Sequence, residues 1–393
     1  MTRVGFVVPR YGDGIAGGAE VAAKLLAEHL AAVDGFDCEV FTTTALDAAT
    51  WRNEVPAGTT SEHGVSVHRF ASQSGRGANF AALDARVLGG ASALTVDESW
   101  RWLEQLGPVC PDAVDAAVDS ACGVVTLGPY MYHPIVTAVS RLGRRAVLHP
   151  ATHDEPAIHL PIYEPVFTGA GALAWWSEPE RRVAARLFPS TVTHPQLVVG
   201  IGVDPVPAVA ATPAMQACSD RPFVLCLGRV LAAKGSQALA VGFAAYKQRF
   251  PGPLALVFAG EPHDPIPPHP DIVELGMVDT ATKHALLTNA TALVSPSPNE
   301  SLALVVLEAW SAATPVIVNG AAPVTRDHCV RSGGGLWFDD YATFEAAITR
   351  ITTDAALAQC LGRAGQAYVA GQYSWPVVIE RYVSFLERIC ERL

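Results

Sequence analysis

The stretch GVDPVPAVAATPAMQACSDRP, residues 202–222, divides this sequence into two halves. It is rich in Pro and Ala and shows neither the helical nor the strand periodicity of its surroundings, which is typical of a linker between domains. A chain of 393 residues is also longer than one compact core usually accommodates. We therefore expect two domains joined by this stretch.

Strand-like runs alternate with helical stretches on both sides of the linker. The runs before it are RVGFVVP (3–9), CEVFTTT (38–44), GVSVHRF (64–70), GVVTLGP (123–129), RAVLHP (145–150) and ALAWWS (172–177). The runs after it are FVLCLG (223–228), LALVFAG (254–260), IVEL (272–275), TALVSPS (291–297) and TPVIV (314–318). Two such series predict an α/β protein with two doubly wound, Rossmann-like domains. Because such sheets bind ligands at the carboxyl ends of their strands, we expect a shared site in a cleft between the domains.

Two regions add detail to this pattern. Residues 72–122 depart from the alternation, with helical pieces near 79–89 and 97–106, and we interpret part of them as an insertion. Farther on, Ser177 and Glu180 form a capping-box pattern with Pro179 between them, which predicts a helix start after the strand at 172–177.

Composition excludes several classes of protein. The formal charge of −11 argues against a nucleic-acid surface, which is usually basic. The eight cysteines form no C-x-x-C pair and are typical of core residues in a reducing compartment. The first residues lack the features of a signal peptide, and no apolar run is long enough to cross a bilayer. We expect a cytoplasmic protein without stable membrane insertion; its oligomeric state is open.

Two glutamates flank the apolar run in PNESLALVVLEAW (298–310). Glu300 falls on the loop after the strand at 291–297, and Glu308 lies one to two turns into the following helix. The backbone N–H groups near Ala303, Leu304 and Val305 are then the unpaired donors of a helix start, which favours phosphate. The two acids could bracket a nucleotide sugar, whose diphosphate lies between sugar and ribose. Two solvated surface acids are the alternative.

A second segment, LGRVLAAKG (227–235), follows the first strand after the linker. Arg229 and Lys234 in this loop could neutralise a diphosphate as its bond to a sugar breaks. The order G-K-[ST] of a Walker A motif is absent. Solvated basic loop residues remain the alternative.

Near the amino terminus, YGDGIAGGAE (11–20) contains G-x-G-x-x-G. A dinucleotide site is an alternative here, but the second strand ends in TTT without the acid that would bind a ribose. The stretch LHPATHDEP (148–156) follows another predicted strand and carries His153. His149 and His159 are close enough to make a metal conceivable, but their spacing is not diagnostic, and no D-x-D motif is present.

Taken together, these motifs resemble the retaining glycosyltransferases of family 4, which have the GT-B fold. The matching features are the GR…KG loop, the E-x7-E segment with EAW and TPVIV after it, GIGVD (200–204), GGAE (17–20) and the terminal YSWPVVIERYVSFL (373–386). The resemblance implies an acceptor-binding domain at 1–203, a donor-binding domain at 204–374 and a terminal helix, 375–393, that packs back on the first domain.

The resemblance also assigns roles. Glu300 contacts donor-sugar hydroxyls, Glu308 holds the ribose, Arg229 and Lys234 clamp the diphosphate, and His153 lies near the reacting sugar. The implied donor-binding set is Gly17, Gly18, Gly228, Arg229, Lys234, Glu300, Ser301, Leu302, Ala303, Leu304, Val305 and Glu308; further candidates are His149, Asp154 and Met277. Leu302 and Ala303 stand where the family commonly has an aromatic residue and Gly, respectively. The resemblance therefore does not identify the donor sugar.

We therefore expect a retaining glycosyltransferase that moves a hexosyl group from a UDP- or GDP-sugar to a hydroxyl group without a metal or other cofactor. His153, Glu300, Arg229 and Lys234 are the predicted catalytic residues. Residues 1–200 hold 14 basic against 21 acidic residues, so we expect a soluble acceptor rather than a lipid at an anionic membrane. A nucleotide-sugar epimerase or hydrolase and a non-catalytic nucleotide-sugar-binding protein are the alternatives.

Overall fold

The computed structural model describes residues 1–15, 17–73, 75–90, 94–207, 209–216, 218 and 220–393. The chain forms two compact units: unit 1 is Met1–Gly202 with Val378–Leu393, and unit 2 is Val203–Val377. Parts of the predicted linker and of the segment at 72–122 lie outside the described residues.

Unit 1 contains an eight-stranded sheet, counted over the described residues, in the order β3-β4-β2-β1-β5-β6-β7-β8. Its strands are β1 (Thr2–Val7), β2 (Phe36–Thr43), β3 (Gly58–Glu62), β4 (Val65–Phe70), β5 (Val124–Leu127), β6 (Ala146–Leu148), β7 (Ala172–Trp175) and β8 (Gln196–Val198). Neighbouring strands are parallel except β3 and β4, which form an antiparallel hairpin. Strands β5, β6 and β7 are buried along their length, as expected for a parallel sheet covered on both faces.

The helices of unit 1 connect these strands. They are α1 (Gly18–Ala31), α2 (Phe80–Gly90), α3 (Val96–Leu106), α4 (Pro111–Asp119), α5 (His133–Leu142), α6 (Glu164–Gly169), α7 (Glu178–Leu187) and most of α14 (Trp375–Cys390). Helices α2 and α3 correspond to the two helical pieces expected within 72–122. The terminal helix α14 is tied to this unit by Tyr382, whose hydroxyl lies 2.9 Å from Thr126 Oγ1.

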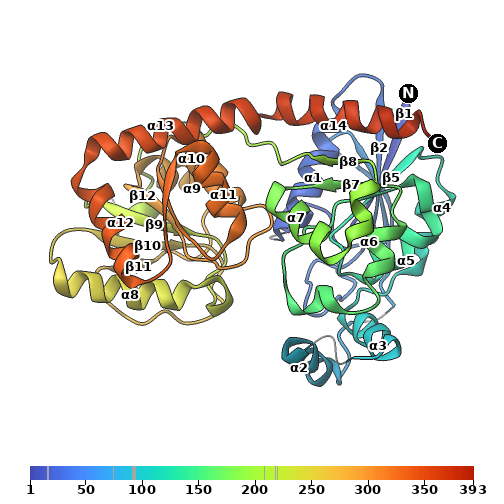
Figure 1. Ribbon diagram of the computed structural model, residues 1–393, viewed down its shortest axis with the longest axis horizontal. Helices are drawn as coiled ribbons and strands as arrows, with labels where there is room; N and C mark the ends of the chain where they lie inside the picture. The colour runs from blue at the N-terminus through green and yellow to red at the C-terminus, as the bar shows by residue number, and fades with distance from the viewer. Residues whose placement is uncertain (16, 74, 91–93, 208, 217, 219) are drawn as a thin grey trace. The chain divides into compact units, whose positions relative to one another are not determined.

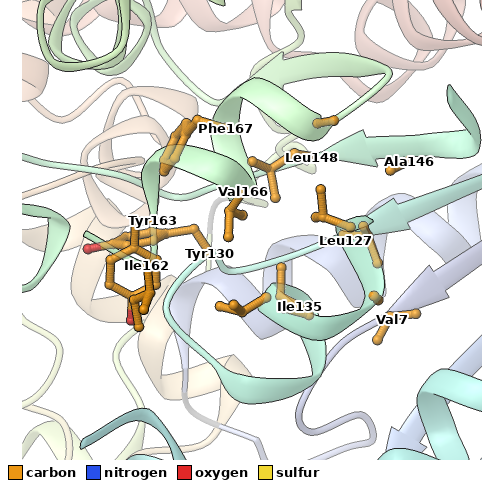
Figure 2. Close-up of a cluster of buried hydrophobic side chains, with 14 of the residues drawn as sticks. Val7, Leu127, Tyr130, Ile135, Ala146, Leu148, Ile162, Tyr163, Val166 and Phe167 are labelled. Atoms are coloured by element: carbon orange, nitrogen blue, oxygen red, sulfur yellow. The ribbon is translucent and has the colours of Figure 1, made fainter. Parts of the chain in front are cut away.

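The core of unit 1 lies beneath the loops that leave β5 and β6. Figure 2 shows Leu127 and Leu148 from these strands facing Ile135, with Tyr130 and Tyr163 nearby. The two tyrosine rings meet edge to face, with centroids 4.7 Å apart. This packing fixes the root of the loop after β5.

Unit 2 contains a six-stranded sheet within the described chain, in the order β11-β10-β9-β12-β13-β14, and its neighbours are all parallel. Its strands are β9 (Phe223–Leu227), β10 (Ala255–Ala259), β11 (Ile272–Glu274), β12 (Ala292–Ser295), β13 (Val316–Asn319) and β14 (Gly335–Phe338). Its helices are α8 (Ser236–Arg249), α9 (Thr280–Asn289), α10 (Leu304–Ser311), α11 (Pro323–Ser332), α12 (Tyr341–Thr353) and α13 (Ala355–Gln372).

Helices cover both faces of this second sheet: Figure 1 shows α8 below it and α10 and α13 above it. The two-domain, parallel-sheet α/β prediction is therefore confirmed. The pairing of β9 with β12 matters most for function, because it places the loop after β9 beside the loop after β12. These loops carry the GR…KG and E-x7-E motifs.

Candidate active site

The loop after β9 is shaped by two glycines. Gly228 adopts φ +123°, and Gly235 adopts φ +78° as the residue before α8. A Cβ atom on Gly235 would lie 2.7 Å from the carbonyl oxygen of Pro296, so a larger residue would push the two loops apart. Arg229 is exposed and forms no ion pair with any described residue. The KG pair thus brings Lys234 against the loop that carries Glu300.

Lys234 and Glu300 form a direct ion pair. The lysine Nζ lies 2.8 Å from Glu300 Oε1 and 3.3 Å from the carbonyl oxygen of Asn299. The side chains remain 33% and 20% exposed, respectively. The sequence predicted both residues in one site but assigned them to different parts of the donor; the structure joins them. Because the pair is accessible to solvent, a ligand anion can compete for the lysine.

The start of α10 presents free backbone donors. Its N-cap residue is Ala303, which adopts the left-handed conformation with φ 56° and ψ 42°, and no described side chain caps the helix. The N–H groups of Leu304 and Val305 therefore lie among the unpaired donors of the first turn. Ser301 is half-buried and Leu302 is buried just ahead of them. This arrangement suits a phosphate.

The left-handed conformation of Ala303 shows why Gly would suit this position. Left-handed backbone costs a residue with a Cβ atom roughly 1–2 kcal/mol, whereas Gly adopts it freely. The resembled family commonly has Gly here, and this chain keeps the backbone conformation with Ala.

Glu308 is paired with a lysine that the sequence did not identify. Lys283 Nζ lies 2.8 Å from Glu308 Oε1, with side-chain exposures of 31% and 16%, respectively. Lys283 lies in the first turn of α9, whose start is fixed by Asp279 accepting a hydrogen bond from the Thr282 N–H at 2.7 Å. The residues after Asp279 signal a helix start, but which side chain faces α10 depends on tertiary packing. Met277, between β11 and α9, is 68% exposed.

Glycines of unit 1 open the loop before α1. A Cβ atom on Gly17 would lie 1.9 Å from Glu20 Oε2, so this glycine makes room for a buried carboxylate that binds Arg10 at 2.7 Å. A Cβ atom on Gly18 would meet nothing within 4 Å. The space beside Gly18 is therefore open. A dinucleotide site would need a carboxylate at the end of β2 to bind a ribose. Strand β2 instead ends at Thr43, whose hydroxyl donates to the Pro9 carbonyl.

The loop after β6 sends its titratable side chains in different directions. His153 is half-buried, and its Nε2 lies 3.3 Å from Glu155 Oε2. Asp154 instead joins a surface cluster with His159, at 2.9 Å, and Arg186. His153 thus has the partly accessible position that a site residue requires, whereas Asp154 is committed to surface ion pairs.

His149, a further candidate, lies buried in unit 1. Its side chain is 3% exposed, and Nε2 lies 3.1 Å from the Tyr382 hydroxyl. Burial lowers the pKa of His149 to about 3, so the ring is neutral. His149 and His159 also have separate partners, which gives no support to a metal site shared by them; no group of three or more metal-ligating side chains occurs in the described residues.

Comparison with known proteins supports the resemblance. Residues 221–354 match the family model of Glycosyl transferases group 1. A GDP-mannose-dependent alpha-(1-6)-phosphatidylinositol monomannoside mannosyltransferase of Mycobacterium tuberculosis is 26% identical over 42% of this chain and 48% of its own length. An alpha-maltose-1-phosphate synthase of the same organism is 25% identical over 56% of this chain and 64% of its own length. The chain thus spans about half to just under two thirds of these relatives.

Solved structures share the fold of the whole chain. Sucrose-phosphate synthase from Thermosynechococcus elongatus superposes with a TM-score of 0.74 at 16% identity, over 100% of both chains. A trehalose-6-phosphate protein from E. coli bound with UDP-2-fluoro glucose gives 0.72 at 12% identity, over 98% of both chains. Anabaena HepE in complex with UDP and glucose gives 0.67 at 13% identity, over 99% of this chain and 100% of the other. The predicted resemblance to a GT-B glycosyltransferase is confirmed; membership of family 4 stays a prediction.

Proposed function

We propose that the protein is a retaining glycosyltransferase that moves a hexosyl group from a nucleoside diphosphate sugar to a hydroxyl group of a soluble acceptor. The observation that carries this proposal is the pair of lysine–glutamate bridges on either side of the uncapped start of α10. Together they offer cations and backbone donors for a diphosphate, with one carboxylate toward each end. A nucleoside diphosphate sugar has this order of groups.

In the proposed mechanism, the donor replaces Glu300 as the partner of Lys234. The donor diphosphate attracts Lys234 and Arg229, and the N–H groups at the start of α10 donate hydrogen bonds to its oxygens. Movement of Lys234 toward phosphate frees the Glu300 carboxylate to accept hydrogen bonds from sugar hydroxyls. As the bond between sugar and diphosphate breaks, these same cations stabilise the charge on the leaving group. Glu308 holds the ribose, and His153 contacts the sugar or the acceptor.

The donor is a UDP- or GDP-sugar in this proposal. The mycobacterial mannosyltransferase is described as GDP-mannose-dependent, and two structural neighbours contain UDP with glucose or a fluoro-glucose. Because the cations come from the protein, we expect activity to survive exhaustive EDTA treatment. A strict requirement for Mg²⁺ or Mn²⁺, restored by adding the ion, would contradict a metal-free phosphate site.

The arginines of unit 1 support a soluble acceptor. The two basic clusters, RLGRR (141–145) and ERRVAAR (180–186), hold six arginines, and each has a carboxylate or carbonyl partner. Asp115, Glu178 and Asp154 neutralise part of this positive charge, which weakens the attraction to anionic lipid. In the described chain, no helix is long and apolar enough to cross a membrane. Salt-reversible pelleting with phosphatidylglycerol vesicles would contradict this part of the proposal.

Incubation with UDP-glucose and GDP-mannose, with and without a panel of sugar and sugar-phosphate acceptors, tests the reaction itself. We expect acceptor-dependent release of nucleoside diphosphate, and NMR of the glycoside should show the anomeric configuration of the donor. Rapid conversion of the donor without acceptor would instead indicate an epimerase or hydrolase. Tight donor binding without turnover would indicate a binding protein.

A further inference from the structure

The capping box at the start of α7 does more than cap its helix. Glu180 is 1% exposed, and its Oε2 accepts hydrogen bonds from the backbone N–H of Trp176 at 2.6 Å and of Ser177 at 3.4 Å. A capping box requires only the bond to the N-cap residue, here Ser177. The other oxygen, Oε1, accepts from the N–H of Thr152 at 2.8 Å. Thr152 belongs to the loop of a neighbouring strand–helix unit.

The loop that Glu180 reaches carries His153 and has strained backbone. Strands β6 and β7 are parallel neighbours, so the loop after β6 lies beside the turn from β7 into α7. Ala151 in this loop adopts φ 56°, a left-handed conformation that is unfavourable for a residue with a Cβ atom. Such backbone persists where surrounding contacts fix it. Glu180 supplies such a contact one residue after Ala151 and one residue before His153.

The ring of His153 is held by a second set of contacts. Its Nε2 lies 3.3 Å from Glu155 Oε2, and Tyr130 donates its hydroxyl to Glu155 Oε1 at 2.8 Å. Tyr130 is rooted in the core beside Tyr163, as Figure 2 shows. Glu155 thus holds the ring of His153, and Glu180 holds the backbone just before it. If Thr152 shifted, the ring of His153 would change its position relative to Glu155.

We propose that Glu180 is a positioning residue for His153, which it holds in place through the N–H of Thr152. It is too enclosed to contact substrate, so its role is to fix the loop. The consequence for catalysis rests on the proposed function, in which His153 contacts the sugar or the acceptor. The structural claim, that Glu180 sets the geometry of His153, stands apart from it.

The variant Glu180→Gln tests this claim because an amide has one acceptor oxygen and cannot serve both Thr152 and the start of α7. Burial raises the pKa of Glu180 to about 8, so the comparison is made at pH 9, where the wild-type carboxylate is ionised. The matched control is Glu98→Gln. Glu98 completes the capping box of α3 with Thr95, accepts from the Thr95 N–H at 2.9 Å and lies on another element.

NMR of protein labelled with ¹³C-histidine, ¹⁵N-threonine and ¹⁵N-tryptophan gives the readout, with His153 assigned through His153→Gln. At pH 9 an unprotected amide exchanges too fast to be seen, so the Thr152 amide should remain visible in the wild type. In Glu180→Gln we expect this signal to vanish or move and the His153 ring signals to shift. In Glu98→Gln both should stay in place.

Donor kinetics add a second arm. We expect Glu180→Gln to lower kcat at least about tenfold with a much smaller change in the donor KM, since the groups proposed to bind the diphosphate and the ribose lie in unit 2. The proposal is wrong if Glu180→Gln lowers the melting temperature but leaves the NMR signals of His153 and Thr152 unchanged. Glu180 would then act only as a helix cap. Should the variant fail to fold, absence of the wild-type Thr152 amide at pH 9, with Trp176 visible, would also overturn it. A wild type without transferase activity would refute the proposed function and leave the NMR result standing.

Discussion

The carboxylates of the two units are held in contrasting ways. In unit 1, Glu20 and Glu180 are 5% and 1% exposed and are bound by the half-buried Arg10 or by backbone N–H groups, respectively. In unit 2, the side chains of Glu300 and Glu308 are 20% and 16% exposed, and each is bound to one lysine. Fixed acids shape loops, whereas accessible lysine–glutamate pairs can exchange partners with a ligand. Substitutions in unit 1 should therefore affect structure and turnover, and those in unit 2 should affect donor binding.

The largest effect is expected at the phosphate clamp. A charged hydrogen bond contributes about 1.5–3 kcal/mol, so Lys234→Ala or Arg229→Ala should lower kcat/KM for the donor about 10- to 100-fold. Stability should change little, because Lys234 is one-third exposed and Arg229 is exposed. Arg249→Ala, which breaks a surface pair with Glu345 in the same unit, is the control and should retain activity. Unchanged kinetics in both clamp variants would remove the assignment.

The two glutamates of unit 2 should respond differently. Glu308→Ala removes the proposed ribose contact and should weaken binding of a free nucleoside diphosphate by about fivefold. Glu300→Ala frees Lys234 from its carboxylate partner, so affinity for the free diphosphate should be equal or higher while turnover falls. Calorimetry with the bare diphosphate separates these outcomes. Equal losses of affinity in both variants would show that the acids do not face opposite ends of the donor.

The buried acid of unit 1 should make stability depend on pH. Burial raises the pKa of Glu180 from 4.5 to about 8 despite the backbone N–H groups that lower it. The folded state thus retains the proton more tightly than the unfolded state, and this stabilisation is lost as pH rises from about 4.5 toward 8. The melting temperature should therefore fall over this range in the wild type and fall less in Glu180→Gln. Parallel curves for the two proteins would contradict a raised pKa at this residue.

The smallest effect concerns the start of α10. Ala303→Gly relieves a left-handed alanine but gives the unfolded chain more freedom, so the net stabilisation should be at most about 1 kcal/mol. Ala313, at the other end of α10, has φ 57° and provides the matched control, Ala313→Gly. Both substitutions should change the free energy of unfolding by similar small amounts. A large loss of stability in Ala303→Gly alone would show that its Cβ atom makes a contact that the backbone argument omits.

The sequence predicted much of the fold because long apolar runs alternate with helical stretches. The edge strand β3, GTTSE, was missed because it is polar and largely exposed and lacks an apolar face. Strands β8 and β14 were also missed, and both are only partly buried. These strands all lie toward the edges of their sheets, where burial constrains residue type least.

The candidate site was predictable where motif residues lie close in sequence to a strand end. The GR…KG and E-x7-E segments follow neighbouring strands, so their proximity follows from topology. The pairing of Lys283 with Glu308 depends on how α9 packs beside α10, and local spacing does not reveal it. Likewise the capping box showed that Glu180 begins a helix but not that its second oxygen reaches Thr152. The choice between His149 and His153 also required side-chain directions.

Calorimetric titration of GDP and UDP into the wild type and into Lys234→Ala/Glu308→Ala tests the central claim most directly, because this double variant breaks both exchangeable pairs and leaves unit 1 intact. We predict saturable binding of at least one nucleotide to the wild type. The double variant should bind it at least about tenfold more weakly, with its melting temperature little changed. Binding of neither nucleotide, or equal affinity in the wild type and the double variant, would contradict a donor site built on these lysine–glutamate pairs.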